Sequence, residues 1–311
     1  MRNTAVVVCP RRSLPTCFAI DGPDGMKISS VSLLAYRMTG ARFAGYAAAL
    51  GHTGTLNSFK AQRQGEMTIV EKRAVILAGG RGTRLKPYTV ALPKPLVPVG
   101  DKPILEIIVR QLCSHGFKRL TLAVNHQADI IRAYFGNGSK FGIAIDYSLE
   151  TIPLSTMGPL LLVENLPSSF IVMNGDVLTD LDYGALLDRH EREGNLLSIS
   201  AAQREQPIDF GVLEVEEGGR LIGFREKPVD RYLVSMGVYA LSNRVLHYIP
   251  AGEPYGFDNL VLDLLKANEA VKVYPYAGYW LDIGRPDDYE RAVEDFTRKG
   301  ARFPKDAMDV P

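Results

Sequence analysis

The sequence predicts an α/β fold with a doubly wound, mainly parallel mixed sheet. The first observation is a run of apolar residues at 74–78 that ends at Gly79, because such runs are typical of strands buried on both faces. The second is the alternation of similar runs with segments whose apolar residues recur at helical spacing, which favours right-handed βαβ units. With 46% hydrophobic and 23% charged residues in 311, the chain can bury a sizeable core.

Strands and helices alternate regularly in the first series of predicted elements, whereas several strands follow one another in the second. The first series consists of a strand at 74–78, a helix at 103–113, a strand at 120–124, a helix at 128–135, a strand at 143–147, a helix at 160–166 and a strand at 170–173. The second series consists of a helix at 183–193, strands at 196–201, 211–215, 221–225 and 233–240, a helix at 259–268, a strand at 271–276 and a helix at 287–296. Glu217, Gly218 and Gly219 predict a hairpin turn within it.

A basic segment precedes the predicted domain. Residues 1–66 contain eight Lys and Arg but three acidic residues, and their order shows no sustained helical or strand periodicity. We therefore predict an N-terminal extension at 1–66 and one domain at 67–311. We favour a disordered extension translated from an upstream start, with Met67 as the natural beginning, over a targeting segment.

The composition excludes several classes of protein. A formal net charge of +1 gives no overall attraction for nucleic acid. Three cysteines, without a C-x-x-C pair, argue against a disulfide framework and against a cysteine zinc site, and they favour a reducing, cytoplasmic setting. No uncharged apolar run reaches about 18 residues, so we expect no membrane span.

The first strand runs into a loop that contains Gly79, Gly80 and Gly82. Glycines at the end of a strand let the backbone turn tightly and bring its N–H groups close to an anion. Arg84 adds a planar cation suited to phosphate oxygens, and Lys94 is held between two prolines a few residues later. A tight turn with a surface arginine is the alternative. The loop lacks the third glycine of the dinucleotide fingerprint, and the chain contains no P-loop motif.

Two stretches, G-G-R-G-T-R-L-K-P-Y-T at 79–89 and L-P-K-P-L-V-P-V-G-D-K-P at 92–103, resemble the signature of the sugar-phosphate nucleotidyltransferases. The resemblance covers about residues 73–296 and implies the Rossmann-like fold of that family. It also implies the family reaction, in which an NTP and a sugar 1-phosphate give an NDP-sugar and pyrophosphate. These two substrates are then the expected partners, and the sequence leaves a homo-oligomer open.

Two aspartates are the candidates for a metal site. Asp176 follows a buried strand, and a carboxylate beside a triphosphate calls for a cation, for which Mg²⁺ is the natural choice. Asp282 lies within an aromatic and apolar strand, where a carboxylate without a partner is costly. Both resemble the metal-binding aspartates of the family and would share one Mg²⁺. The alternative is a turn or helix-cap role, which we assign to Asp180 and Asp182.

The resemblance implies the remaining roles. Arg84, Lys94 and Lys227, the last in an E-K-P motif, are expected to be catalytic cations that hold the phosphates. The expected nucleotide-binding residues are Leu77, Ala78, Gly79, Gly80, Gly82, Thr83, Glu150, Thr156 and Gly158. The expected sugar-binding residues are Asn174, Gly211, Glu226 and Gly237.

The segment at 150–160 departs from the pattern of guanylyltransferase-like members, which read L-G-T-A-G-P-L here. Ser155 replaces the first glycine and Met157 replaces the alanine. If the glycine adopts positive φ, the serine costs roughly 1–2 kcal/mol. We expect Met157 to fill part of the base pocket, which leaves the preferred base open.

Three functions remain open from the sequence. We favour a GTP-dependent guanylyltransferase acting on mannose 1-phosphate or a heptose 1-phosphate. A thymidylyl-, cytidylyl- or uridylyltransferase acting on glucose 1-phosphate or a related sugar is the alternative within the same chemistry. A catalytically silent regulatory subunit that binds nucleotide sugars is the alternative of another class, and the presence of all the expected cations and aspartates argues against it.

Overall fold

The computed structural model describes residues 71–299, so the predicted extension at 1–66 and the domain boundary after it lie outside the described residues. A seven-stranded sheet in the order β12-β8-β11-β6-β1-β4-β5 forms the centre. Its strands are β1 (Arg73–Leu77), β4 (Arg119–Val124), β5 (Ala144–Leu149), β6 (Ser169–Asn174), β8 (Leu197–Pro207), β11 (Val229–Ser242) and β12 (Val271–Tyr276). Only β11 pairs antiparallel with its neighbours in this sheet, so the predicted mainly parallel mixed sheet is confirmed.

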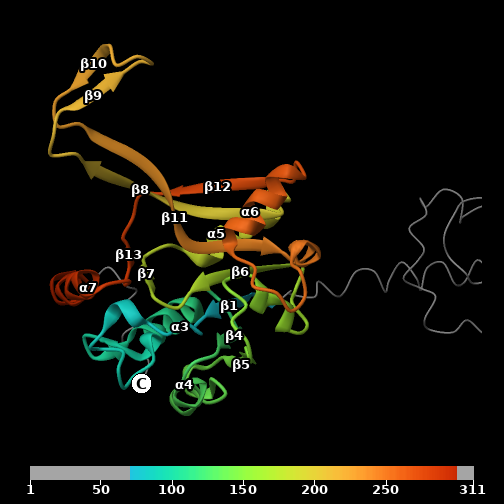
Figure 1. Ribbon diagram of the computed structural model, residues 1–311. Helices are drawn as coiled ribbons and strands as arrows, with labels where there is room; N and C mark the ends of the chain where they lie inside the picture. The colour runs from blue at the N-terminus through green and yellow to red at the C-terminus, as the bar shows by residue number, and fades with distance from the viewer. Residues whose placement is uncertain (1–70, 300–311) are drawn as a thin grey trace, which may run out of the picture. The chain divides into compact units, whose positions relative to one another are not determined.

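Helices cover both faces of the sheet (Figure 1). The α-helices of the described residues are α3 (Ile104–Ser114), α4 (Ala128–Phe135), α5 (Tyr183–Glu193), α6 (Phe257–Lys266) and α7 (Pro286–Lys299). Consecutive residues of β1 face opposite cores, because Ile76 packs in the cluster that contains Leu186 of α5, and Val75 packs in the cluster that contains Leu260 of α6. This arrangement is the doubly wound fold that the sequence predicts. None of the described helices is long and apolar enough to cross a membrane.

The helix expected at 160–166 is instead a short 3-10 helix, η5 (Gly158–Leu162). The chain cannot continue helically, because Asn165 has a φ of 55° and Pro167 disfavours the helical conformation of the residue before it. The apolar run in this segment therefore folds as an irregular connection packed on the sheet.

Strands β8 and β11 extend well beyond the predicted strands at 196–201 and 233–240. The extra residues form a two-stranded ribbon that leaves the sheet and leads to the hairpin of β9 (Val212–Val215) and β10 (Leu221–Arg225) (Figure 1). Cross-strand ion pairs such as Arg231 to Glu205, at 3.0 Å, stabilise this exposed ribbon. A strand that is solvated on both faces shows no alternation of apolar and polar residues. The sequence therefore predicts β8 and β11 too short.

Three short two-stranded sheets complete the described part of the chain. The hairpin of β9 and β10 turns at Gly218 and Gly219, whose φ angles are 92° and 86°, as the sequence predicts. Strands β2 (Pro98–Val99) and β3 (Lys102–Pro103) pair ahead of α3. Strand β7 (Val177–Thr179) follows β6 and pairs with β13 (Trp280–Asp282), which precedes α7. The last pairing brings the C-terminal part of the domain to the edge of the central sheet.

Ser155 has a φ of 63°, the left-handed conformation that favours glycine. Its side chain is exposed. The serine is therefore strained at a position where the related pattern has glycine.

We expect Ser155→Gly to increase the free energy of unfolding by about 0.5–1 kcal/mol, because glycine removes the strain but adds entropy to the unfolded chain. Urea denaturation measures this difference. Ser155→Ala is the control, since alanine keeps the strain and should leave the stability close to that of the wild type. Equal stability of all three proteins would contradict the assignment of strain.

Candidate active site

The site begins at the carboxyl edge of two neighbouring parallel strands, β1 and β6. Leu77 at the end of β1 is in register with Asn174 at the end of β6. Beyond the strands, the amide of Gly175 donates to the carbonyl of Leu77 over 2.9 Å, and the amide of Ala78 donates to the carbonyl of Ala123 over 2.8 Å. These bonds fix the start of the glycine loop beside the segment that carries Asp176, at the edge where open α/β sheets bind ligands.

Two aspartates from distant parts of the chain meet at this edge. Asp176 lies two residues beyond the end of β6, and Asp282 ends β13. The antiparallel pairing of β13 with β7 sets Asp282 opposite Val177, and the amide of Ile283 donates to the carbonyl of Asp176 over 3.0 Å. The structure thus brings together the two residues that the sequence assigns to one metal ion.

Two of the predicted cations affect the charge of Asp282. Loss of hydration raises the pKa of Asp282, and the negative charge of Asp176 raises it further. Lys94 and Arg84 oppose both effects and lower the same pKa. Four of the predicted residues therefore share one electrostatic environment, in which two carboxylates repel each other and two cations offset the repulsion.

Lys94 is buried, with 9% of its surface exposed, and its ammonium group forms an ion pair with the carboxylate of Asp176. It begins the short 3-10 helix η3 (Lys94–Leu96), and Pro93 and Pro95 restrict the backbone on both sides, as the sequence predicts. The ammonium group of Lys94 thus supplies a fixed positive charge beside Asp176.

The glycine loop packs directly against this lysine. Gly82 has a φ of 62°, and a Cβ at this position would lie 2.9 Å from the Cβ of Lys94 and 2.9 Å from the Cγ2 of Thr89. The hydroxyl of Thr89 donates to the carbonyl of Gly82 over 2.7 Å and fixes the turn. A side chain at Gly82 would displace Lys94. Thr83 and Arg84, which follow in η2 (Thr83–Leu85), are exposed, and Gly80 borders open space.

The two aspartates fit a magnesium ion. The Oδ1 atom of Asp176 is buried and has no hydrogen-bond partner, so this oxygen lacks the donor or cation that a buried carboxylate requires. Carboxylate oxygens are the protein ligands that Mg²⁺ prefers, and it commonly takes only one or two of them, with phosphate and water completing the shell. Within 71–299 no group of three or more His, Cys, Asp or Glu side chains could hold a metal.

Glu150 lies beside Gly79, the first residue of the glycine loop. It follows β5, and a Cβ on Gly79 would lie 3.0 Å from its Oε1 atom and 3.2 Å from the Cβ of Asn125. Burial raises the pKa of Glu150, while a hydrogen bond from the amide of Leu154, at 3.2 Å, lowers it. Asn125, which follows β4, is a neighbour of the loop that the sequence analysis missed, because a lone asparagine after a strand carries no distinctive signal.

The next residues of this segment make packing contacts. The hydroxyl of Thr156 accepts a hydrogen bond of 2.8 Å from the amide of Phe257, the first residue of α6. A Cβ at Gly158 would lie 2.8 Å from the Cβ of Leu154. Met157 is fully buried in the core that also contains Tyr255, so the expectation that it fills the base pocket is wrong. The nucleotide-binding roles of Thr156 and Gly158 remain predictions.

Two of the predicted sugar-binding residues lie next to Asp176. Gly237 has a φ of 74°, and a Cβ there would lie 2.7 Å from the Nδ2 atom of Asn174. It sits where the pairing of β11 with β8 shifts register, and the indole of Trp280 donates to the neighbouring carbonyl of Met236 over 2.9 Å. At this irregularity, β11 therefore lies beside Asn174 of β6 and Trp280 of β13.

The other residues predicted for the sugar phosphate lie elsewhere. Gly211, Glu226 and Lys227 are exposed at the base of the hairpin of β9 and β10, where a Cβ on Gly211 would lie 3.3 Å from the Oε2 atom of Glu226. At about 3.3 Å per residue, β11 separates Val229 from Gly237 by roughly 25 Å. Figure 1 shows the hairpin clear of β7 and β13. The structure therefore does not bring Lys227 to Arg84, Lys94 and the aspartates.

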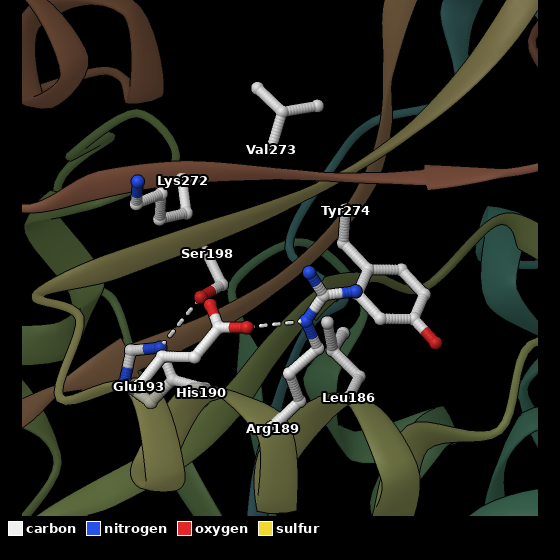
Figure 2. Close-up of a pocket in the computed structure, with 8 residues that line it drawn as sticks. All are labelled: Leu186, Arg189, His190, Glu193, Ser198, Lys272, Val273 and Tyr274. Carbon is white, nitrogen blue, oxygen red and sulfur yellow. Dashed lines mark hydrogen bonds and ion pairs between the residues drawn. The ribbon is translucent and has the colours of Figure 1, made fainter.

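A separate cavity lies between α5 and strands β8 and β12 (Figure 2). His190 points toward it, with its Nδ1 atom 2.9 Å from the hydroxyl of Ser198. The cavity has a volume of about 10 Å³, which is room for one water molecule at most. None of its lining residues belongs to the predicted site, so this cavity is not a substrate pocket.

Comparison with known proteins indicates the family of this chain. The family model described as nucleotidyl transferase matches residues 73–299. A mannose-1-phosphate guanyltransferase of Yarrowia lipolytica is 35% identical over 225 residues, which cover 70% of this chain and 62% of that protein. A UTP–glucose-1-phosphate uridylyltransferase of Synechocystis is 31% identical over 241 residues, which cover 71% of this chain and 62% of that protein. The chain thus spans less than two thirds of the length of these relatives.

A match with a solved structure covers nearly all of that structure. HddC from Yersinia pseudotuberculosis, crystallised with GMP-PN, superposes with a TM-score of 0.57 at 29% sequence identity. The match covers 72% of this chain and 99% of that structure. With the family model spanning the whole described domain, the chain belongs to the nucleotidyl transferase family.

Proposed function

We propose that this chain transfers a nucleoside monophosphate from an NTP, GTP by preference, to a mannose- or heptose-type sugar 1-phosphate. An oxygen of the sugar phosphate attacks the α-phosphorus, and the bond to the β-phosphate breaks, so that pyrophosphate leaves and an NDP-sugar forms. The observation that carries the proposal is the meeting of Asp176, Asp282 and Lys94 beside the glycine loop. The guanyltransferase of Yarrowia and the HddC complex support the choice of a guanine nucleotide.

The chain would bring two polyanions together by positioning and charge, without a covalent intermediate. The N–H groups of the glycine loop and the guanidinium of Arg84 would hold the β- and γ-phosphates. Lys94 would neutralise Asp176 and stabilise the leaving pyrophosphate. Asp176 and Asp282 would hold Mg²⁺, which supplies Lewis-acid stabilisation of phosphate charge when bound.

Glu150 favours guanine on chemical grounds. A carboxylate is an acceptor only, and the guanine edge presents two adjacent donors, whereas uracil and thymine present one donor between two carbonyl groups. Its place beside Gly79 puts this acceptor next to the loop assigned to the phosphates. The uridylyltransferase relative keeps thymidylyl, cytidylyl and uridylyl transfer as the alternatives.

Lys227 would bind the phosphate of the sugar 1-phosphate, and Glu226 would accept hydrogen bonds from sugar hydroxyls. Both lie on the hairpin, so these roles require the hairpin to lie nearer the aspartates in the substrate complex than it does here. The cytoplasmic setting, the absence of a nucleic-acid partner and a homo-oligomer stay predictions from the sequence.

Pyrophosphate release tests the proposed reaction. With Mg²⁺ present, each common nucleoside triphosphate is paired with a panel of sugar 1-phosphates that includes those of mannose, heptose and glucose. We expect the fastest release with GTP and a mannose- or heptose-type sugar 1-phosphate. Release with another nucleotide would shift the assignment to one of the alternative transferases. Saturable binding of nucleotide sugars without any release would instead favour the regulatory subunit.

We expect Asp176→Asn and Asp282→Asn each to raise the Mg²⁺ concentration that gives half-maximal activity, because each removes one charged ligand. A metal titration of pyrophosphate release measures the shift. Asp287→Asn is the matched control, since this aspartate is an exposed first-turn residue of α7 and should leave the titration unchanged. Titrations of both site variants that coincide with the wild type would refute the shared metal.

We expect Lys227→Ala to lower kcat/KM for the sugar 1-phosphate about 10- to 100-fold, because one charge-assisted hydrogen bond is lost. The KM for the NTP should stay unchanged. Arg220→Ala is the control on the same hairpin, since Arg220 is exposed and pairs with Glu216. If Lys227→Ala behaves like this control, the hairpin lysine has no part in the reaction.

A further inference from the structure

A polar network ties the segment before β13 to the end of β7, and no role assigned above uses it. The carboxylate of Asp180 accepts hydrogen bonds from the amide of Tyr279, at 2.6 Å, and from the hydroxyl of Tyr276, at 2.5 Å. The hydroxyl of Thr179 donates to the carbonyl of Tyr279 over 2.7 Å. Asp180 is thus not the turn or cap residue that the sequence suggests, whereas Asp182 is the N-cap of α5.

The network leaves no room for a side chain between its two tyrosines. A Cβ on Gly278 would lie 2.5 Å from the Oδ1 atom of Asp180 and against the hydroxyl of Tyr276. Burial raises the pKa of Tyr276, and the hydrogen bond to Asp180 raises it further, so the phenol remains a donor. The Oδ1 atom of Asp180 therefore accepts both of its hydrogen bonds from the segment that enters β13.

The other side of the network is anchored in the core. The side chain of Gln111 on α3 donates to the carbonyl of Thr179 over 2.8 Å, and Thr179 is fully buried. The end of β7 is therefore bonded to α3 in the core on one side and to the segment that enters β13 on the other.

The register of β13 needs such a constraint, because the ladder that pairs it with β7 spans Trp280 to Asp282 only. A slip of one residue in a strand moves every side chain to the opposite face. In β13 that slip would turn Asp282 away from Asp176. The amide of Ile283 bonded to the carbonyl of Asp176 holds the far end, and Asp180 with Thr179 holds the near end.

We propose that Asp180 is a positioning residue that fixes the register of β13 and thereby holds Asp282 beside Asp176. This inference rests on the proposed metal role of the two aspartates. We assign Asp180 no contact with substrate or metal. Its carboxylate acts through the backbone of Tyr279, three residues before Asp282.

Trp280 provides a direct readout, because it is the only tryptophan of the chain and lies within β13. Mn²⁺ is titrated into the full-length protein with GTP present, and quenching of Trp280 fluorescence gives a Kd. We expect Asp180→Ala to raise this Kd about tenfold or more, as the loss of groups that orient metal ligands does elsewhere. Asp180→Asn, which keeps an acceptor oxygen for Tyr279, should restore much of the affinity.

Asp182→Ala is the matched control, since it removes the same charge two residues away and weakens only the cap of α5. A second measurement, acrylamide quenching without metal, should show greater access to Trp280 in Asp180→Ala than in Asp182→Ala. Wild-type Mn²⁺ affinity and wild-type acrylamide access in Asp180→Ala would overturn the inference. If the wild type shows no saturable Mn²⁺ quenching, the shared metal of the proposed function fails, and the acrylamide result alone decides the role of Asp180.

Discussion

Repulsion between two neighbouring carboxylates is the constraint around which this site is built. Asp176 and Asp282 belong to segments that the pairing of β13 with β7 makes neighbours, and loss of hydration, followed by the charge of Asp176, raises the pKa of Asp282. A buried ion pair with Lys94 offsets part of that cost. Charge repulsion of this kind is acceptable where a divalent cation is to bind, since the same two oxygens that repel each other then become ligands.

The constraint explains why rigid elements surround the site. Lys94 lies between two prolines, Gly82 admits no side chain beside it, and the hydroxyl of Thr89 fixes the turn at Gly82. A flexible lysine would lose its position beside Asp176 to solvent. Binding sites that rely on charge rather than on covalent chemistry need this preorganisation, because a cation that must first be ordered contributes less to the stabilisation of a transition state.

Much of the fold and half of the site follow from local sequence. The buried strand before Gly79 is a continuous apolar run, and the helix at 183–193 has apolar residues at helical spacing. The prolines on both sides of Lys94 indicate a restricted backbone. Local sequence patterns could not predict the pairing of β13 with β7. The ladder is three residues long, so it has no periodicity to detect, and its two strands are about a hundred residues apart in the chain. Asp180 was misread for the same reason, since its partners are Tyr276 and Tyr279.

The hairpin of β9 and β10 is held in place less firmly than the residues around the two aspartates. The sugar-binding candidates divide between two places, with Asn174 and Gly237 at the sheet and Gly211 and Glu226, next to Lys227, at the end of the ribbon. A two-stranded ribbon is stabilised mainly by its own ladder and few core contacts, so its direction costs little free energy to change. The shift of register around Gly237 lies at the point where the ribbon leaves the sheet. If Lys227 binds the sugar phosphate, the free energy that draws it to the aspartates must come from that phosphate, because no fixed contact with the rest of the sheet holds it there.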